Sequence, residues 1–302
     1  MKNASYGSEF IRDIRANEIL TLIGVHDVFS ASIAGRYGHI FVSGFGFAAS
    51  HYGLPDIGFI AWPDMVDFVR RIRNILPRHH ILVDIDDGYC DPAVAVQVVK
   101  QMEAVGASAV KLEDQKRPRK CGHFDGKEIL ELPEYLDKLQ QVLQARKEML
   151  VIARTDAVEK NEILRRVAAF ARTDADIILA DGMKDLGLLK ELKSAAQGKP
   201  LLFNQIAGGK SPAVTVEELG KAGVSVVIFS TPCLFASQAA ILSALRGIHA
   251  AKGRLATARE TGDEFVGVSQ CTSLLMDNLK GVAPPEREMF GNPDMTSAIY
   301  AA

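Results

Sequence analysis

Eight short apolar segments recur along this chain, and stretches with helical periodicity separate most of them. The segments run continuously apolar instead of alternating with polar residues, which is typical of strands buried on both faces of a parallel sheet. They span residues 18–25, 39–43, 81–86, 108–113, 149–154, 176–181, 200–204 and 224–229. The helical stretches lie at 92–105, 132–146, 158–172, 184–196, 215–222 and 234–250. Eight such units are the number that closes a (β/α)₈ barrel of the TIM type.

A doubly wound open sheet is the alternative architecture. No GxGxxG follows the first predicted strand, which weakens the dinucleotide-binding version of that fold. We therefore treat residues 1–302 as one barrel domain in which residues 252–302 form a C-terminal helical extension and tail. Within it, 256–282 is expected to form one or two helices. Apolar helices beyond a complete barrel need another surface to cover them, so we expect a subunit interface and a homo-oligomer.

Charge and cysteine content restrict the class of protein. The 35 Lys and Arg residues nearly balance 37 Asp and Glu residues, so the net charge of −2 gives no electrostatic footprint for nucleic acid or an anionic membrane. The first residues lack the apolar core of a secretory signal, and no segment approaches the roughly 18 apolar residues of a membrane span. The four cysteines show no metal-binding spacing. We expect a cytoplasmic protein without nucleic-acid or membrane partners.

Polar side chains follow six consecutive predicted strands at the point where each apolar segment ends. The C-terminal ends of parallel barrel strands lie on one face, where barrel enzymes build their active sites. The sequence therefore predicts a functional site there, made from Ser43 and Gly44, Asp84 and Asp86, Glu113, Arg154, Asp181 and Asn204.

The acidic residues at this face have the chemistry of a metal site. Asp84 and Asp86 are two residues apart and would point the same way on a strand, and Glu113 on the next strand adds a third carboxylate. Like charges this close repel unless a cation or basic group lies between them. An all-oxygen cluster suits Mg²⁺, or Mn²⁺, better than zinc. The alternative is a solvated DxDDG turn, which the matching positions of Glu113 and Arg154 disfavour.

Two basic features accompany the carboxylates. Arg154 is expected to clamp a substrate carboxylate and offset developing negative charge, or else to pair structurally with Asp156 or Glu113. In the loop EDQKRPRKCGHFDGKEIL, lysines and arginines surround Cys121, with His123 two residues further on. Nearby cations favour the thiolate, and such loops often close over a reacting centre. A basic surface loop that happens to contain a cysteine is the alternative.

Five segments resemble the isocitrate lyase/phosphoenolpyruvate mutase superfamily and occur in that family's order. They are LPDIGF (54–59), VDIDDGY (83–89), KLEDQKRPRKCGH (111–123), IARTDA (152–157) and NQIAGGKSP (204–212). The resemblance runs from about residue 18 to about residue 280. It implies a (β/α)₈ barrel that exchanges its final helix between subunits and assembles as a dimer of dimers.

The resemblance also implies roles for individual residues. Asp84, Asp86 and Glu113 match magnesium-binding positions, and Asp56 matches an outer-shell aspartate. Cys121 matches the catalytic cysteine of the lyase branch, and we group Arg154 and His123 with it as catalytic candidates. The candidate substrate-binding residues are Ser43, Gly44, Phe45, Asp84, Gly122, Arg154, Asn204 and Asp181.

The lyase branch includes isocitrate, 2-methylisocitrate and dimethylmalate lyases. In its chemistry a 2-hydroxy acid loses its hydroxyl proton, the adjacent C–C bond breaks, and an enolate-like intermediate takes a proton from the cysteine. The resemblance thus implies a Mg²⁺-dependent lyase that cleaves a small 2-hydroxy (di)carboxylic acid, with a small anionic 2-oxo or 2-hydroxy acid as its substrate partner.

Several residues depart from the family pattern. Phe41 stands in place of a tyrosine, Phe45 of a small residue, Asp181 and Ala207 of glutamates, and Phe235 lies near the place of an arginine. Fewer polar partners disfavour a tricarboxylate, whose extra carboxylates would be left unpaired. A phosphonomutase is the alternative function, because carboxyphosphonoenolpyruvate phosphonomutase also resembles this chain. A catalytically silent binding protein is disfavoured, since the site residues are retained.

Overall fold

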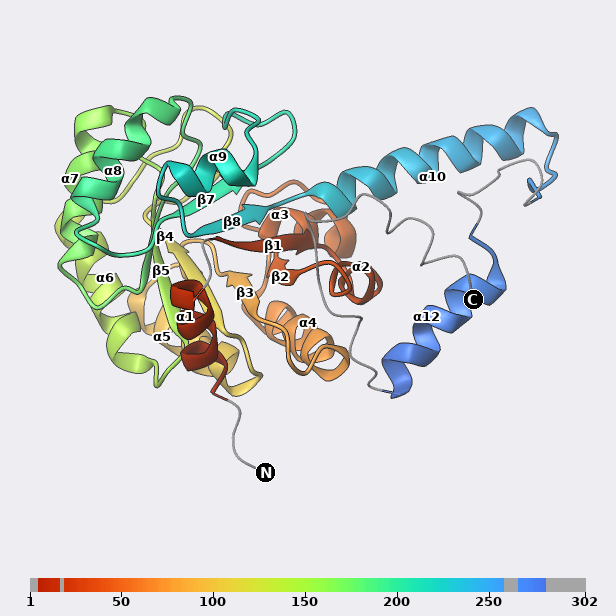
Figure 1. Cartoon of the computed structure of the whole chain (residues 1–302), viewed down its shortest axis with the longest axis horizontal. Coiled ribbons are helices and arrows are strands. Elements are labelled where there is room, and N and C mark those ends of the chain that lie inside the picture. Colours follow the sequence, from red (N-terminus) through yellow and green to blue (C-terminus); the bar gives the residue numbers. More distant parts are fainter. Residues whose placement is uncertain (1–4, 17–18, 258–265, 281–302) are drawn as a thin grey trace.

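A computed structural model describes residues 5–16, 19–257 and 266–280 of the chain. Eight parallel strands form a nearly closed barrel surrounded by helices (Figure 1). The strands are β1 (Leu20–Val25), β2 (His39–Val42), β3 (Ile81–Asp84), β4 (Ala109–Glu113), β5 (Leu150–Thr155), β6 (Ile177–Ala180), β7 (Leu202–Gln205) and β8 (Val226–Phe229). Each begins and ends within two residues of its predicted position.

The strand order confirms the barrel and shows that the open-sheet alternative is wrong. Hydrogen-bonded neighbours run β6-β5-β4-β3-β2-β1-β8-β7, so the first strand pairs with the eighth. The remaining seam between β6 and β7 carries an isolated parallel bridge between Ile178 and Leu201. There the Ile178 N–H donates to the Pro200 carbonyl at 3.0 Å.

The helices that cover the barrel follow their strands; those between residues 92 and 250 were predicted, and the three between residues 28 and 75 were not. They are α2 (Val28–Ala34), α3 (Gly44–Phe47), α4 (Trp62–Ile75), α5 (Pro92–Ala104), α6 (Leu132–Ala145), α7 (Lys160–Ala171), α8 (Leu189–Ala195), α9 (Val216–Lys221) and α10 (Pro232–Ala250). A π-helical turn, η1 (Ala48–Tyr52), follows α3, and a 3₁₀ turn, η2 (Leu186–Leu188), precedes α8. Proline in the first turn of α4, α5, α6 and α10 suits positions where the backbone N–H needs no partner.

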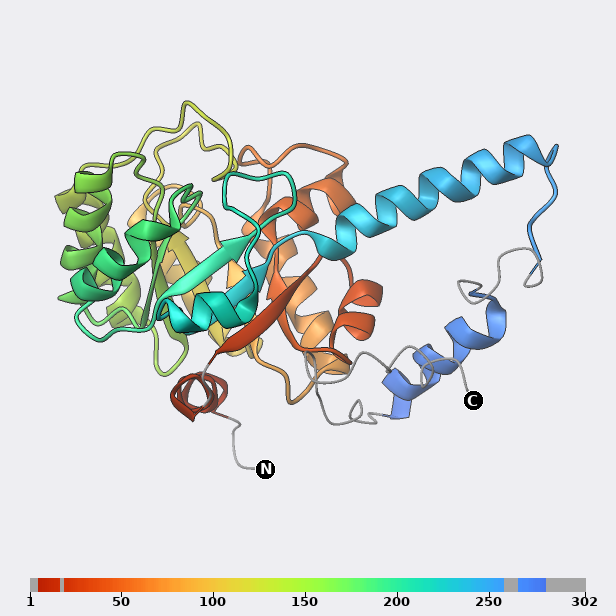
Figure 2. The ribbon, with the colours of Figure 1, turned by 45° about the horizontal axis from the view of Figure 1, so that its top comes forward.

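The helix α1 (Tyr6–Ala16) closes the N-terminal end of the barrel and was not predicted (Figure 2). Phe10 and Ile14, four residues apart on one face, are buried among inward-facing strand residues such as Leu82 and Ile152. The barrel interior is therefore a packed core at this end, so the opposite, C-terminal end is the one that can hold a site.

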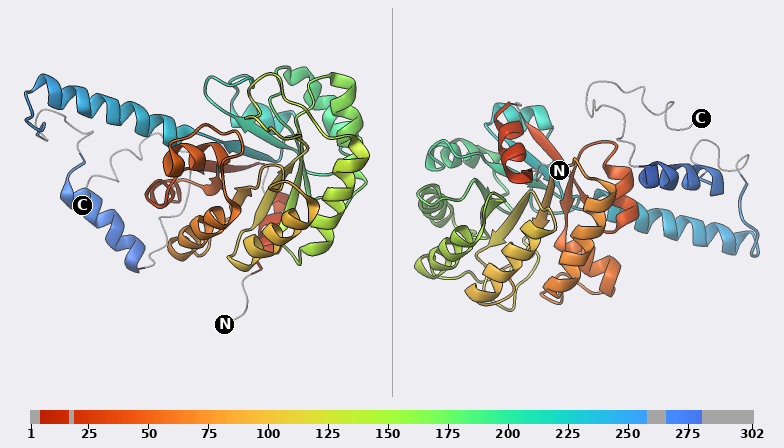
Figure 3. Two further views of the ribbon diagram at one scale, coloured as in Figure 1. Left: turned by 180° about the vertical axis from the view of Figure 1, so that it is seen from behind. Right: turned by 90° about the horizontal axis from the view of Figure 1, so that it is seen from below.

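The helix α10 extends away from the barrel, and α12 lies back toward α2 (Figures 1 and 3). No residue of α10 is buried, and α12 (Val268–Lys280) follows it in the chain. Asp277 on α12 pairs with Arg36, which follows α2, at 2.6 Å. Of the predicted helical region 256–282, positions 258–265 and 281–282 lie outside the described residues. Exchange of a helix between subunits stays a prediction. In the part of the chain that the structure describes, no helix is long and apolar enough to cross a membrane.

Candidate active site

A small cavity of about 20 Å³ lies at the C-terminal end of the barrel. Ten predicted site residues line it: Ser43, Phe45, Asp56, Asp84, Cys121, Gly122, His123, Arg154, Asp181 and Asn204. Lys111, Ile206 and Ser230 line it as well and were not predicted, and Phe41 lies on the same wall. By this measure the cavity has room for about one water molecule, so a substrate of several heavy atoms enters only if part of the wall moves.

Asp84 and Asp86 converge, though not for the predicted reason. The strand β3 ends at Asp84, and Asp86 follows with a φ of 51°, in the left-handed region that few non-glycine residues adopt. A turn, rather than strand alternation, therefore brings its side chain to the site. A Cβ at Gly44 would lie 3.1 Å from Asp86 Oδ1 and 3.5 Å from Asp84 Oδ2. Gly44 thus lets the backbone after β2 approach both carboxylates.

Arg119 lies among these carboxylates, so at this residue the alternative of a basic surface loop does not hold. Its guanidinium, 1% exposed, contacts Asp56, lies 3.3 Å from Asp86 Oδ1 and donates to Glu113 Oε1 at 2.9 Å. Three of the four predicted metal-site acids, Asp56, Asp86 and Glu113, therefore contact the same buried guanidinium. The fourth, Asp84, pairs with Lys111 Nζ at 2.9 Å inside the barrel.

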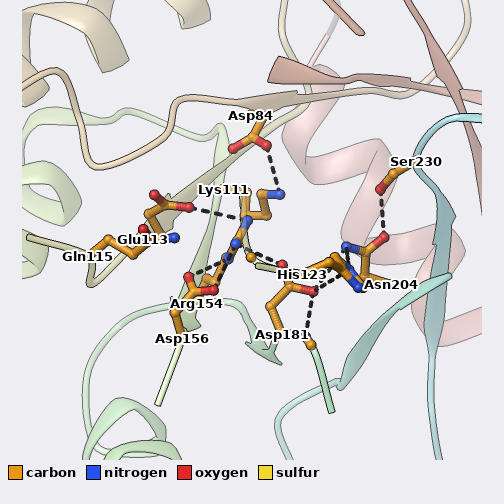
Figure 4. Close-up of polar contacts among 12 residues, drawn as sticks. Asp84, Lys111, Glu113, Gln115, His123, Arg154, Asp156, Asp181, Asn204 and Ser230 are labelled. Carbon is orange, nitrogen blue, oxygen red and sulfur yellow. Dashed lines mark hydrogen bonds and ion pairs between the residues drawn. The ribbon is translucent and has the colours of Figure 1, made fainter. Parts of the chain in front are cut away.

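Arg154 makes the structural ion pairs that were the alternative to a free substrate clamp (Figure 4). It forms a bidentate pair with Asp156 at 2.8 and 3.0 Å, and also contacts Glu113 at 3.2 Å and Asp181 at 2.7 Å. Burial alone would lower the pKa of this guanidinium, but the surrounding carboxylates raise it well above its usual value. Arg154 is thus a fixed positive charge at the cavity wall.

Asp181 and Asn204 form the wall opposite Asp84, next to His123 (Figure 4). Asn204 Nδ2 donates to Asp181 Oδ1 at 2.9 Å, and Ser230 Oγ donates to Asn204 Oδ1 at 2.5 Å, which fixes the orientation of the amide. Burial would raise the pKa of Asp181, but Arg154 and His123 lower it well below its ordinary value. Asp181 is therefore ionised.

Cys121 does not meet the cations that flank it in the sequence. Arg117 pairs with Asp87 at 2.7 Å, Arg119 points into the carboxylate cluster, and Lys120 Nζ donates to the Gly126 carbonyl. Burial, together with the charge of Asp56, instead raises the pKa of the Cys121 thiol to about 11. The flanking cations Arg117, Arg119 and Lys120 therefore do not stabilise a Cys121 thiolate, because their side chains bind other partners.

The buried charges at this end of the barrel do not balance. Among the described residues, the ion-paired set comprises six carboxylates, Asp56, Asp84, Asp86, Glu113, Asp156 and Asp181, against four cations, Lys111, Arg119, Lys127 and Arg154. Two formal negative charges remain. Burial raises the pKa of Glu113 to about 7 and that of Asp86 well above its usual value. Each also has one buried oxygen without a hydrogen-bond partner, Asp86 Oδ1 and Glu113 Oε2.

This excess of two negative charges matches the charge of one divalent metal ion. No group of three acidic, histidine or cysteine side chains in the described ranges is arranged as a metal cage. Mg²⁺ does not require such a cage, because it keeps several waters and binds through one or two carboxylates together with substrate oxygens. The donor set therefore fits Mg²⁺, with Asp84 and Asp56 the candidate ligands that line the cavity.

Aromatic side chains form the remaining wall. The rings of Phe45 and Phe235, the latter in the first turn of α10, meet edge to face with centroids 6.2 Å apart. The Phe41 ring lies 5.0 Å from Lys111 Nζ, an orientation in which the ring attracts the ammonium. Phe41, Phe45 and Ile206 make one side of the cavity apolar, and Phe235 contacts that side through the Phe45 ring.

Comparison with known proteins places this site in a family. The family profile described as phosphoenolpyruvate phosphomutase matches residues 11–249. The chain belongs to the phosphoenolpyruvate mutase/isocitrate lyase superfamily. The resemblance inferred from its five motifs is thereby confirmed.

Individual relatives of this superfamily member cover most of the chain. The 2-methylisocitrate lyase of Aeropyrum pernix is 32% identical over 240 residues, or 78% of this chain and 77% of the relative. The 2,3-dimethylmalate lyase of Eubacterium barkeri is 29% identical over 228 residues, or 72% of this chain and 78% of the relative. A structure of oxaloacetate acetylhydrolase with the inhibitor 3,3-difluorooxalacetate aligns with a TM-score of 0.84 and 27% identity, covering 91% of this chain and 95% of the other. These relatives support an enzyme.

Proposed function

We propose that the protein is a Mg²⁺-dependent carbon–carbon lyase that cleaves a small 2-hydroxy (di)carboxylic acid to a 2-oxo acid and a second acid. The observation that carries this proposal is the Cys121 thiol, which lines the cavity and has a raised pKa. A group that stays protonated at neutral pH is suited to donate a proton, not to attack as a nucleophile. The similarity to relatives named 2-methylisocitrate lyase and 2,3-dimethylmalate lyase supports this reaction class.

The bond changes balance with the groups at the site. The hydroxyl oxygen of the substrate gives up its proton to solvent and forms the carbonyl of the 2-oxo acid, and the adjacent C–C bond breaks. The electron pair of that bond passes to the departing carbon as an enolate-like anion, which takes the proton of the Cys121 S–H. The thiolate is reprotonated from solvent before the next turnover.

Fixed positive charge supports the developing anion. Arg154 is held in one orientation by Asp156, so it needs no rearrangement when negative charge appears beside it. Asp84, Asp86, Glu113 and Asp56 would hold Mg²⁺, which when bound supplies Lewis-acid stabilisation of the substrate oxygens. Ser43 and Asn204 add polar groups to the cavity wall. His123 is a further candidate for proton transfer.

The aromatic wall restricts the substrate. In the described part of the chain, the cations that line the cavity, Lys111 and Arg154, are already paired with carboxylates. A third carboxylate on the substrate would face Phe45 and Ile206 without a partner, at a large desolvation cost. We infer a substrate smaller or more apolar than a tricarboxylate.

A phosphonomutase is the second candidate, because the matching family profile is that of phosphoenolpyruvate phosphomutase. Such an enzyme would form or rearrange a C–P bond at the same site. Phosphorus NMR of the protein incubated with candidate phosphonates separates the two functions, since a lyase leaves the phosphorus resonances unchanged.

The lyase proposal is tested with a panel of 2-hydroxy acids, by following release of the 2-oxo acid with and without Mg²⁺. We expect EDTA to abolish turnover and added Mg²⁺, or Mn²⁺, to restore it. Cys121→Ser is expected to abolish turnover while Mg²⁺ binding survives, because serine cannot replace the thiol as an acid. Full activity of Cys121→Ser, or activity indifferent to EDTA, would contradict the proposal.

We further propose a homo-oligomer, a dimer or a dimer of dimers, in which the exposed apolar residues of α10 and α12 contact other subunits. The free state of Cys90, Cys121, Cys233 and Cys271 is consistent with a cytoplasmic location, where thiols remain reduced. The near-neutral overall charge gives no support for a nucleic-acid or membrane partner.

A further inference from the structure

The Cys121 loop, residues 116–128, contacts the segment between β7 and α9 through one residue in particular. Lys210 Nζ donates to the Phe124 carbonyl at 2.9 Å and to Asp125 Oδ1 at 2.6 Å. The backbone N–H of the same residue donates to His123 Nδ1 at 2.9 Å. Lys210 therefore holds three consecutive residues of the loop, immediately after Cys121 and Gly122.

The neighbouring backbone is shaped for this contact. A Cβ at Gly209 would lie only 2.5 Å from His123 Nδ1 and 2.2 Å from the Ile206 side chain, so the imidazole packs directly on the glycine backbone. On the other side, a Cβ at Gly122 would lie 2.4 Å from Arg154 Nη2 and 2.4 Å from Asp181 Oδ2. The loop therefore packs directly against the residues of the site, which leaves it little room to shift in its closed position.

The contact also determines the protonation of the imidazole. A backbone amide can only donate, so His123 Nδ1 accepts and carries no proton. The other ring nitrogen, Nε2, lies 3.6 Å from Asp181 Oδ1 and 3.2 Å from Asn204 Nδ2. Asn204 Nδ2 donates to that same oxygen, so the carboxylate faces the imidazole and the amide together.

We propose that Lys210 is a positioning residue that holds the Cys121 loop closed through its contacts with Phe124 and Asp125. The consequence for the reaction rests on the proposed function, because it concerns the thiol that donates the proton. The contact between Lys210 and the loop does not rest on the proposed function. Opening it would release Phe124 and Asp125 and widen a cavity that is too small for substrate entry while closed.

Alkylation of Cys121 reports loop opening without any turnover. We would treat the full chain with iodoacetamide and follow Cys121 by peptide mass spectrometry, using the exposed Cys90 in the same molecule as the internal reference. Lys210→Met keeps the apolar stem but removes the amine. We expect it to raise the rate of Cys121 alkylation by about tenfold, because the loop loses hydrogen bonds made by a charged group.

Three further variants make the result specific. Lys116→Met removes an exposed lysine from the same loop and should match the wild type, while Lys210→Arg, which keeps a charged donor, should restore most of the protection. Asp125 is 90% exposed, so Asp125→Ala should fold normally and speed alkylation less than Lys210→Met. Because the two side chains share one contact, the double variant should not exceed Lys210→Met.

The proposed role of Lys210 would be overturned if Lys210→Met left the rate of Cys121 alkylation unchanged. It would also be overturned if Lys116→Met raised that rate equally. Alkylation needs no substrate, so this outcome is distinct from failure of the lyase assignment. If the lyase assay succeeds, Lys210→Met should lower kcat more than it raises KM and Lys210→Arg should recover kcat. A change in KM alone would contradict the positioning role.

Discussion

The Cys121 thiol lies beside carboxylates, and this decides its chemistry. Burial removes water that would stabilise a thiolate, and the negative charge of Asp56 opposes a second negative charge nearby. The resulting pKa of about 11 keeps the proton on sulfur at neutral pH. An acid of this kind gives up its proton only to a strong base such as an enolate, which fits the final step of the proposed reaction.

The pH dependence of alkylation tests this pKa. Only the thiolate reacts, and its fraction rises about tenfold per pH unit at pH values below the pKa. With a pKa of about 11, alkylation of Cys121 should keep rising from pH 7 to pH 10 and level off only near pH 11. A plateau below pH 9, measured by peptide mass spectrometry, would show instead that the thiolate is stabilised in the folded protein.

The imbalance of buried charge predicts the effect of removing one carboxylate. Asp84→Asn keeps a hydrogen-bond acceptor for Lys111 but removes one negative charge from a cluster that carries two in excess. We expect Mg²⁺ affinity, measured by calorimetry, to fall at least tenfold because charge–charge attraction dominates binding of a hard cation. Asp67→Asn, on the outer surface of α4, is the matched control and should bind as the wild type does. Equal affinity of all three proteins would argue against Asp84 as a ligand.

At the scale of secondary structure, we expect the short helix α1 to contribute strongly to the stability of the barrel. Phe10 is fully buried, and its ring stacks on His80 with centroids 4.6 Å apart. Together with Ile14 it fills the N-terminal end of the barrel, where inward-facing side chains of several strands meet. Without this helix those strand residues would face water.

Truncation of the Phe10 side chain should therefore destabilise the whole barrel. Phe10→Ala is expected to lower the free energy of unfolding by about 3–5 kcal/mol, because it leaves a cavity that the surrounding strands cannot fill. Urea denaturation followed by circular dichroism measures this loss. Arg12→Ala on the exposed face of α1 should change it by less than about 0.5 kcal/mol. Similar losses in both variants would mean that α1 is not part of the core.

The sequence predicts most elements because buried parallel strands are continuously apolar and each has its own helix. It fails where tertiary contacts override the local pattern. Burial of Arg119 depends on Asp56, which is 63 residues away in the chain, and no local signal reveals that pairing. The helix α1 has charged residues through much of its length, so only the spacing of Phe10 and Ile14 could have indicated it.

The candidate site, too, is predictable from the sequence only in part. Its carboxylates are predictable because they stand at strand ends, where the barrel topology alone brings them together. The state of each group is not predictable, since it depends on partners from other strands and loops. Lys111 neutralises Asp84 and lies in an apolar strand, and Lys210 holds the Cys121 loop and follows two glycines. Neither segment has a local pattern that indicates these contacts.

At the scale of the whole molecule, the C-terminal helices leave apolar side chains uncovered. Ile241 and Leu245 on α10 are each 59% exposed, and Leu275 on α12 is 48% exposed. Spaced four residues apart, the two α10 residues lie on one face of a helix that extends away from the barrel (Figure 1). Exposed apolar side chains of this kind support the proposed contact with a second copy of the chain.

Charge introduced on this face should dissociate the proposed oligomer. Ile241→Glu combined with Leu245→Glu places two carboxylates where an apolar contact is expected, so burial would leave them desolvated and unpaired. Light scattering coupled to size exclusion should give a multiple of the 32.8 kDa chain mass for the wild type and a smaller mass for this variant. Lys221→Glu, on the exposed end of α9, tests for a general effect of added negative charge and should keep the wild-type mass. A wild-type protein that stays at 32.8 kDa at micromolar concentration would rule out this assembly, and the apolar face of α10 would then have to be covered within the monomer.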